Sequence, residues 1–403
     1  MKWYQQAKIT ASDAEAWDMF GYSVSISGDY AIAGAYRDET QSGAAYIFKR
    51  DGSSWIQCDK LTGGDGYFGR TVSISGDYAV VGSYMDFSGV GSVTVFKREG
   101  ASWNQQTVFT GAGDDHFGRA SLIISGDYVI VGADGDGDNG AESGAAYIYK
   151  RDGSSWSQQA KITASDAESN DHFGISVSMS GDYAIVGAYQ DDDNGVDSGS
   201  AYIFKRDGAT WSQQAKITAN AGTEGDSFGW SVSIFGNYAI VGAYQDDVNG
   251  TDSGSGYVFK RDGTSWIQQE KITALDAKKG DRFGYSVSIS GDYAIMGADE
   301  DDATGSAYIH EVWPSIAEIS DPVPGTELST TTVTFTWDNS GADKYWLWVG
   351  ISPGGKDVYS DGQGTNTSRT VGNLPSAGSV YVRLFSLAGG DWFYNDYTYT
   401  AVP

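Results

Sequence analysis

Short runs in which apolar and small polar residues alternate fill most of this 403-residue chain. Residues 176–179 alternate serine with valine or methionine, the pattern of a strand with one face buried. Gly181 and Asp182 then interrupt the run at the spacing of a tight turn, because glycine adopts positive φ without a Cβ clash. Apolar residues 183–187 continue as a second strand. No stretch shows a convincing helical period, so we expect an all-β protein.

Two further strands complete a unit. Residues 201–205 read as a third strand that ends at Asp207 and Gly208, and a fourth begins at Trp211 and alternates through residue 217. The whole unit recurs six times at intervals of roughly 50 residues, which is typical of a solenoid, a propeller or an array. A Phe-Gly pair opens each unit, and its phenylalanines are Phe20, Phe68, Phe117, Phe173, Phe228 and Phe283.

Six units of four antiparallel strands favour a six-bladed β-propeller, in which radial packing protects the sheet edges. The order of the pieces indicates how the ring closes. The chain opens with a fourth strand, Trp3 to Thr10, and the sixth unit ends near residue 310 without one. We therefore expect the N-terminal strand to complete the sixth blade. A seventh, divergent blade drawn from the C-terminal part is the alternative.

The repeat pattern breaks after residue 313, which places the propeller at 1–313. The two prolines of the segment Asp-Pro-Val-Pro-Gly, residues 321–325, mark a linker over 314–325. Alternating runs in 326–403 then predict an immunoglobulin-like or fibronectin-III-like β-sandwich. In residues 344–349, Tyr345, Leu347 and Val349 share one face, and Trp346 and Trp348 share the other. The two tryptophans are candidate ligand-binding residues if exposed; the alternative is that they pack against a neighbouring element.

The net charge of −27 is concentrated in the repeats. Residues 315–403 carry nine acidic and four basic residues, a charge of −5, which leaves −22 on the repeats. Such a field disfavours nucleic acid and anionic membranes, and favours divalent cations and cationic partners. Solubility alone is an equally good explanation. Cys58 is the single cysteine, so no disulfide forms within the chain.

Two features bear on location. No run of 18 apolar residues occurs, so we expect no membrane insertion. Residues 1–2 lead straight into a repeat strand rather than a secretory signal peptide. We expect a signal to have been removed or to lie outside this sequence.

The succession Phe-Gly, short strand, Gly-Asp-Tyr, Ala-Ile-Val-Gly-Ala, acidic loop and Ser-Gly-x-x-Tyr-Ile-Phe resembles the FG-GAP repeat family over residues 1–312. Those repeats build the propeller heads of integrin α-subunits and many secreted bacterial proteins. The resemblance implies an extracellular or cell-surface propeller used for adhesion or ligand binding, often with calcium on its loops. Integrin heads have seven blades and this chain predicts six, so no ligand face is transferred from them.

The acidic loops after the second strands have metal-ligand spacing. The third unit has acids at positions 1, 3, 5 and 9 of its loop, which resembles the calcium loop of FG-GAP domains, and alternate residues of a tight loop can aim oxygens at one Ca²⁺. The fourth and fifth units keep part of this pattern. A solvated acidic turn is the alternative for each loop. The candidate ligands are Asp134, Asp136, Asp138, Glu142, Asp191, Asp193, Asp197, Asp246 and Asp252.

Other recurrent residues indicate structural roles, because an active site is needed once and a packing device in every blade. An aspartate two residues before the phenylalanine recurs in five units, and we expect it to accept backbone N–H bonds. The leading tryptophans of the fourth strands are expected to pack between blades. The aspartates are Asp18, Asp115, Asp171, Asp226 and Asp281, and the tryptophans are Trp3, Trp55, Trp103, Trp156, Trp211 and Trp266.

Catalytic constellations are scarce. His116 and His172 occupy the same repeat position, where other units have Met, Tyr, Ser or Arg, so we interpret it as a tolerated surface position. No nucleophile elbow, phosphate loop or His-x-x-x-His pair occurs. We therefore expect no enzyme and no catalytic residues.

The leading hypothesis is a non-enzymatic extracellular binding or adhesion module, with the propeller presenting loops to a protein or glycan on the cell surface or matrix. The sandwich would act as a spacer or accessory binding domain. The alternatives are a structural subunit of a surface layer or filament, which self-assembles, and a lectin or polysaccharide-active enzyme.

Overall fold

The computed structural model describes residues 6–63, 66–84, 90–113, 115–291, 293–311, 317–339, 342, 344–388 and 391–402. The chain divides into two compact units. The first, the repeat region, comprises residues 1–289 and 295–309, and the second, the C-terminal region, comprises residues 310–403 with the short segment 290–294. Each is described by itself.

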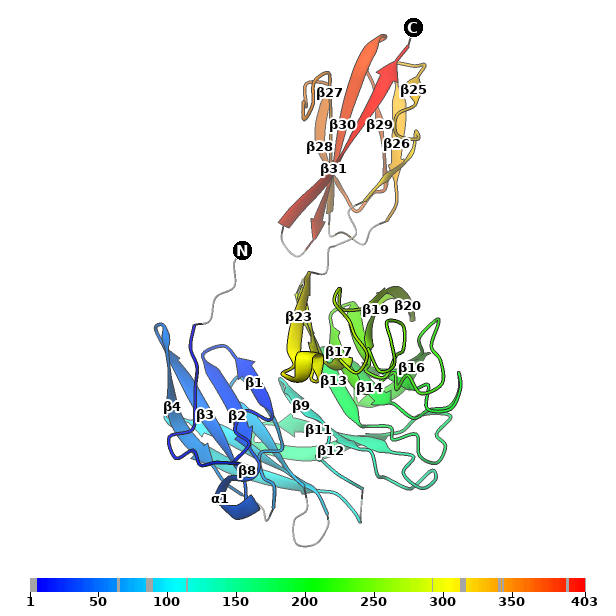
Figure 1. The fold of residues 1–403 in the computed structure, drawn as a ribbon. Helices are drawn as coiled ribbons and strands as arrows, with labels where there is room; N and C mark the ends of the chain where they lie inside the picture. Colours follow the sequence, from blue (N-terminus) through cyan, green and yellow to red (C-terminus); the bar gives the residue numbers. More distant parts are fainter. Residues whose placement is uncertain are drawn as a thin grey trace. The chain divides into compact units, whose positions relative to one another are not determined.

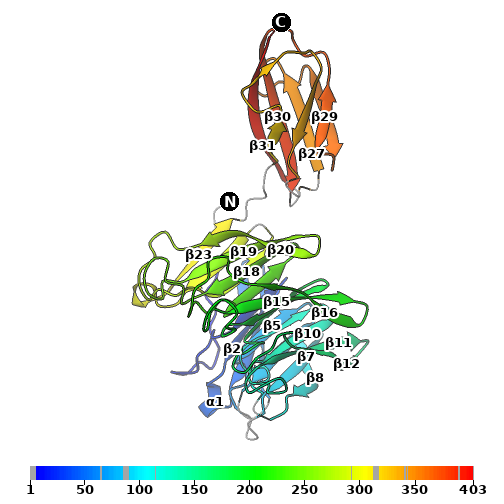
Figure 2. The same cartoon turned by 90° about the vertical axis from the view of Figure 1, so that its right-hand side faces the viewer.

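Six antiparallel sheets, the blades, follow one another along the repeat region, as the sequence predicts (Figures 1 and 2). The first strands are β1 (Val24–Ser27), β5 (Thr71–Ser75), β9 (Leu122–Ser125), β13 (Ser176–Ser180), β17 (Ser231–Phe235) and β21 (Phe283–Ser290). The second strands are β2 (Tyr30–Ala35), β6 (Tyr78–Ser83), β10 (Tyr128–Ala133), β14 (Tyr183–Ala188), β18 (Tyr238–Ala243) and β22 (Tyr293–Ala298). Each first strand pairs with its second strand.

In the first five blades, the outer half is a second hairpin made of the third and fourth strands. The third strands are β3 (Ala44–Asp51), β7 (Ser92–Glu99), β11 (Ala145–Asp152), β15 (Ser200–Asp207), β19 (Ser255–Asp262) and β23 (Ser306–Glu311). The fourth strands are β4 (Ser54–Leu61), β8 (Ser102–Thr110), β12 (Ser155–Ile162), β16 (Thr210–Ile217) and β20 (Ser265–Ile272). Two short helical turns, α1 (Asp38–Gln41) and η1 (Asp301–Ala303), lie in the acidic loops of blades one and six.

Serines of the first strands bind the next blade rather than water. Ser178 Oγ accepts the backbone N–H of Ile234 at 3.1 Å, and Ser73 Oγ accepts that of Ile124 at 3.2 Å. Bonds of this kind link each of the first five blades to its successor. Because an inner strand would otherwise present unpaired N–H groups along its free edge, the hydroxyls protect that edge and set the blades in chain order.

Aromatic residues also join successive blades. The Trp211 ring meets Tyr128 of the preceding blade edge-on at 6.2 Å, and Arg206 lies over the same tyrosine at 4.5 Å. Equivalent Tyr–Trp pairs occur at three other junctions. The prediction that these tryptophans pack between blades is confirmed for Trp103, Trp156, Trp211 and Trp266, whereas Trp3 lies outside the described residues.

The glycines of the repeat motif allow the blades to approach closely. A Cβ added at Gly187 in β14 would lie 1.9 Å from the carbonyl oxygen of Gly229 in the next blade, so no other residue fits there. The phenylalanine of the Phe-Gly pair is fully buried in blades two to six.

The sixth blade contains three strands among the described residues, β21, β22 and β23. Residues 6–10 are described and form no strand, so they do not supply the predicted fourth one. Gln6 nevertheless makes a contact typical of a fourth strand: its Oε1 accepts a hydrogen bond from Trp55 Nε1 at 3.3 Å. Gln159 Oε1 accepts the equivalent bond from Trp211 Nε1 at 3.0 Å.

The C-terminal region is a β-sandwich. One sheet has the order β24-β26-β29 and the other β25-β31-β30-β27-β28. A single core between them contains Phe335, Trp337, Leu347 and Val382. The strands are β24 (Ile319–Asp321), β25 (Glu327–Leu328), β26 (Val333–Trp337), β27 (Lys344–Gly350), β28 (Tyr359–Gly364), β29 (Ser368–Val371), β30 (Gly378–Ala388) and β31 (Asp391–Ala401).

Candidate ligand-binding site

An axial hollow of about 650 Å³ lies between the first strands of the blades. All six blades contribute to its wall, from Tyr22 in blade one to Tyr285 in blade six. The serine bonds between first strands place the blades in chain order around it. The volume is within the range of small-molecule sites, roughly 300–1,000 Å³.

The residue after each Phe-Gly pair lines this hollow and takes four different residue types among the six blades, whereas the Phe-Gly pair before it is repeated in every blade. This set consists of Tyr22, Arg70, Arg119, Ile175, Trp230 and Tyr285. A varied position on a repeated scaffold is where binding specificity can arise without loss of the fold. The sequence shows the variation, but only the structure shows that all six side chains face one space.

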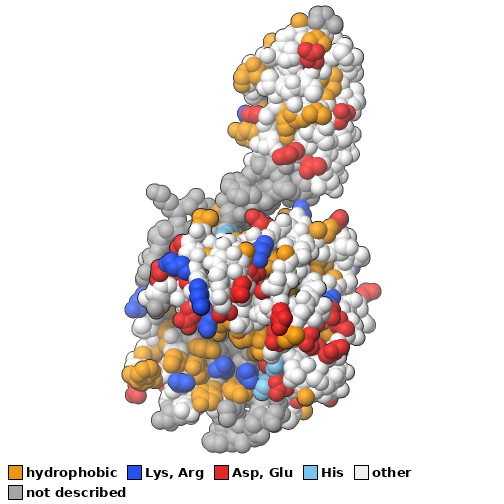
Figure 3. Space-filling model, turned by 45° about the vertical axis from the view of Figure 1, so that its right-hand side comes forward, with side chains coloured by type: hydrophobic (Ala, Val, Ile, Leu, Met, Phe, Trp, Pro, Cys, Tyr) orange, Lys and Arg blue, Asp and Glu red, His pale blue; other side chains and the backbone are white. Residues whose placement is uncertain are grey.

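Aromatic rings and two arginines form the rim of the hollow. The Trp230 ring lies 5.0 Å from Tyr189, 4.9 Å from Tyr244 and 5.7 Å from Tyr285. Arg70 lies 5.6 Å from the Tyr84 ring centroid, and Arg119 lies 5.2 Å from it. Figure 3 shows hydrophobic and basic side chains gathered on one area of the repeat region, with histidine at its border.

Asp134 replaces the tyrosine that blades one, two, four and five carry at this rim. The carboxylate is 2% exposed, and its Oδ2 lies 3.6 Å from His116 Nδ1 and 3.8 Å from His172 Nδ1. Glu142 Oε2 lies 3.3 Å from His172 Nε2. The interpretation of the two histidines as tolerated surface positions is wrong, because both imidazoles are largely buried against this carboxylate.

The remaining acids of that loop lie elsewhere. Asp136 accepts hydrogen bonds from Tyr147 Oη at 2.8 Å and pairs with Lys161 Nζ at 2.6 Å, and Asp138 lies 2.7 Å from the same ammonium. The structure therefore splits the four predicted ligands into two pairs. Burial opposes the charged form of Lys161, but its bonds to Asp136 and Asp138 hold the pKa above its usual range.

The same arrangement recurs in other blades. In blade five, Asp246 accepts the Tyr257 hydroxyl at 2.7 Å and pairs with Lys271 Nζ at 2.6 Å. In blade one, Asp38 does the same with Tyr46 and Lys60, both at 2.7 Å. The lysine comes from the fourth strand and places a positive charge where the sequence analysis expects a cation.

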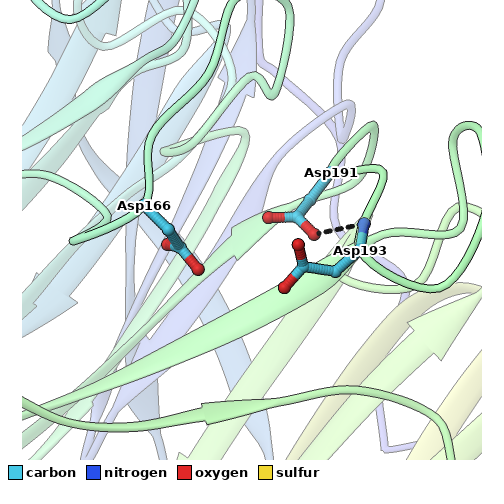
Figure 4. A group of neighbouring side chains, drawn as sticks. All are labelled: Asp166, Asp191 and Asp193. Carbon is cyan, nitrogen blue, oxygen red and sulfur yellow. Dashed lines mark hydrogen bonds between the residues drawn. The ribbon is translucent and has the colours of Figure 1, made fainter.

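Blade four brings three carboxylates together. Oxygens of Asp166, Asp191 and Asp193 lie within 4.8 Å of one another (Figure 4), and the Asp193 N–H donates to Asp191 Oδ1 at 3.2 Å. Lys216 Nζ pairs with Asp166 at 2.9 Å, with Asp191 at 2.8 Å, and also with Asp193. Asp166 was not predicted, because it follows β12 in the preceding blade and only the fold brings it to this loop.

The acids at the ninth loop position lie apart from these clusters. Asp197 Oδ1 accepts a hydrogen bond from Gln190 Nε2 at 2.8 Å, and Asp252 Oδ1 accepts one from Gln245 Nε2 at 3.4 Å. Each carboxylate therefore contacts the side chain at the second position of its own loop.

The aspartate two residues before the phenylalanine, present in five blades, has the predicted structural role. Asp171 Oδ2 accepts the N–H of Glu168 at 2.7 Å, and the other four accept the N–H three residues before them in the same way. Burial raises the pKa of Asp171 to about 6, against the Glu168 N–H bond, which lowers it.

Trp346 and Trp348 lie on the outer face of β27, opposite the buried Tyr345 and Leu347, as the alternation predicts. Trp346 is 39% exposed and meets Trp392 of β31 edge-on at 6.3 Å. Trp348 is half-buried and packs against Phe385 at 4.6 Å. The face therefore carries an aromatic cluster.

Comparisons with known proteins agree with this architecture. The FG-GAP repeat family matches residues 3–48, 55–96, 103–149, 156–204, 211–259 and 266–310, together more than half of the chain. No curated protein matches the chain.

Solved structures that resemble the chain do so at low identity. PorZ, a surface component of the type-IX secretion system of Porphyromonas gingivalis, is 10% identical with a TM-score of 0.43; the match covers 98% of this chain and 61% of PorZ. The chain thus spans under two thirds of PorZ. The propeller domain of the Trilobed protease from Pyrococcus furiosus is 11% identical with a TM-score of 0.45, covering 74% of this chain and 82% of that one.

Within the residues that the structure describes, there is no helix of the length and apolarity that crossing a membrane requires.

Proposed function

This chain belongs to the FG-GAP repeat family, and from that premise we propose that it is a non-enzymatic binding module that works outside the cell or on its surface. The mouth of the axial hollow is its ligand site. The observation that carries this proposal is the variation of one position, after the Phe-Gly pair, in an otherwise repeated wall. Tyr22, at 54% exposed, and Tyr285, at 36%, offer accessible aromatic surface there.

A non-catalytic role is supported by how the titratable groups are used. The loop carboxylates Asp136, Asp191 and Asp246 are each held by a tyrosine hydroxyl and a lysine, an arrangement that recurs from blade to blade. A repeated ion pair stabilises a fold, whereas a general acid or base needs a group poised to exchange a proton with substrate.

The test uses purified protein against an array of glycans and a panel of matrix proteins. We expect binding to at least one ligand, with loss on Trp230→Ala at the hollow and retention with Trp392→Ala on the sandwich. Turnover of a polysaccharide, or binding that survives Trp230→Ala, contradicts the proposal.

The outer face of the sandwich supports a second candidate, an accessory glycan-binding surface. Trp346, Trp392 and Tyr394 are each at least 39% exposed and lie on β27 and β31, two strands of one sheet that flank β30. Aromatic faces of this kind stack on sugar rings. Loss of binding with Trp392→Ala but not with Trp230→Ala favours this candidate over the hollow.

We assign this sandwich to the immunoglobulin-like or fibronectin-III-like type on its two-sheet order.

Calcium remains part of the proposal. The best set of ligands is Asp166, Asp191 and Asp193, which offer the oxygen donors that Ca²⁺ prefers. Lys216 contacts all three carboxylates, so an ion must displace its ammonium. Calcium should therefore raise the melting temperature of Lys216→Gln more than that of the wild type. Equal responses in a chelator-controlled melt contradict this site.

A structural subunit of a surface layer or filament is the alternative role. Ordered polymerisation on addition of calcium, followed by light scattering and microscopy, would support it over the binding module.

A further inference from the structure

Two arginines in the axial hollow have no carboxylate partner among the described residues, although the chain carries a net charge of −27. No ion pair joins Arg70 or Arg119 to an acid in the part of the chain that the structure describes. The contrast is with the third-strand arginines such as Arg206, which pairs with Asp182. Arg70 Nε is moreover buried without a hydrogen-bond partner.

Tyrosine rings hold both guanidinium groups at the hollow. The Arg70 guanidinium carbon lies 5.4 Å from the Tyr22 ring centroid and 5.6 Å from those of Tyr36 and Tyr84. Arg119 lies 5.2 Å from the same Tyr84 ring. Cation–π contacts position a guanidinium through its face. The N–H groups lie in the plane of the guanidinium, so they stay free to donate hydrogen bonds.

The opposite side of the hollow is aromatic. Because six blades follow one another in chain order, blades five and six lie across from blades two and three. They carry Trp230 and Tyr285 at the position of the two arginines. Asp299, the one acid in the described wall, belongs to blade six and faces Arg282 Nη1 at 4.0 Å.

We propose that the hollow binds an acidic sugar, with its carboxylate on Arg70 and Arg119 and a sugar ring against Trp230 and Tyr285. This inference rests on the proposed function and names the ligand class of the same site. Arginine suits the role because its planar fork matches a carboxylate bidentately.

The main chain of the hollow argues against a peptide. A bound peptide strand would need free backbone N–H groups at the inner sheet edges. Those of Val72, Ile124 and Ile234 already donate to serine hydroxyls of the neighbouring blade. Side-chain guanidinium groups and ring faces remain, and these suit a sugar.

The negative field of the repeats does not prevent such binding. At physiological salt, charges farther than about 8 Å from the ligand are largely screened, whereas contacts with the two arginines are not. We therefore expect affinity to change little, or to rise, when salt is increased from low to physiological concentration.

The test titrates the full chain calorimetrically with tetragalacturonate, with a neutral galactose tetramer and with hexaglutamate. We expect tetragalacturonate to bind about tenfold or more tightly than the neutral tetramer. The Arg70→Gln/Arg119→Gln variant should lose that preference. The control variant Arg50→Gln/Lys97→Gln makes the same change in net charge at residues paired with Asp29 and Glu99, and should keep it.

Each other outcome overturns the inference. Binding that survives the arginine substitutions but is lost with Trp230→Ala refutes the carboxylate contact and leaves the proposed function standing. Arginine-dependent binding of hexaglutamate, equal to or tighter than that of tetragalacturonate, refutes the sugar. Absence of binding by all three probes at millimolar concentration refutes the acidic-sugar site.

Discussion

Buried carboxylates in the turns before the first strands show how one residue can stabilise a loop and still carry an electrostatic penalty. Asp171 is 4% exposed and accepts the Glu168 N–H, a bond that orders the turn. Its pKa nevertheless rises from 3.8 to about 6, because burial disfavours the charged form. The hydrogen bond fixes the geometry of the turn, whereas the buried charge lowers the free energy of unfolding above about pH 6.

That penalty predicts a pH dependence of stability. Between pH 3.8 and about 6 the folded carboxyl holds more protons than the unfolded one, so stability falls as pH rises through this window. Asp171→Asn keeps an acceptor oxygen and removes the charge. The free energy of unfolding of the variant should therefore rise relative to that of the wild type, by on the order of 2 kcal/mol as the pH increases from 4 to 7.

Thermal melts across this pH range measure the difference. Asp207→Asn, at the exposed end of β15 in blade four, is the matched control. If the two variants track the wild type in parallel from pH 4 to 7, the penalty at Asp171 is absent.

Residue-level reasoning succeeded where the signal was local. The Asp–amide bond spans three residues, so the repeated aspartate was enough to predict it. The lysine partners of Asp136 and Asp191 were missed, because Lys161 and Lys216 lie 25 residues along the chain in a strand whose alternation gives no hint of the contact.

At the scale of a strand, the serines of the first strands have a role that alternation alone misrepresents. A polar residue at every second position predicts a solvated face. Here the hydroxyls of Ser73, Ser178 and Ser233 instead accept N–H bonds from the next blade. The strands were therefore predictable and the partner of their polar side was not, because that partner lies about 50 residues away in sequence.

The bridges predict a measurable contribution to stability. Ser178→Ala removes the acceptor of the Ile234 N–H and leaves a buried donor unsatisfied, which should cost about 1–3 kcal/mol. Ser157→Ala, on the exposed side of β12, is the control and should change stability by less than about 0.5 kcal/mol. Denaturant unfolding compares the two, and equal midpoints would show that the bridge contributes nothing.

At the scale of the whole ring, closure depends on the opening segment. Two contacts of residues 6–12 are the same as those that a fourth strand and the turn after it make in other blades. Gln6 accepts the Trp55 Nε1–H bond, and the Ser12 N–H donates to Gln57 Oε1 at 2.9 Å, as Ser165 does to Gln213 at 3.0 Å. Although residues 6–10 form no strand in the structure, these contacts predict that the opening segment pairs with the edge of β23 and completes blade six.

The register of that strand predicts a specific ion pair. Lys8 occupies the position of Lys161 and Lys216 in the repeat, and in blade six the corresponding carboxylate is Asp301, which accepts the Tyr308 hydroxyl at 3.0 Å. Closure should bring the Lys8 ammonium to Asp301, where a buried charge-assisted bond contributes about 1–3 kcal/mol. Lys8→Glu should remove that stability, and Lys8→Glu/Asp301→Lys should restore part of it.

A double-mutant cycle on the melting free energies isolates the coupling, with Lys49→Glu as the charge-matched control. Coupling energy indistinguishable from zero would mean that the opening segment leaves the edge of β23 open.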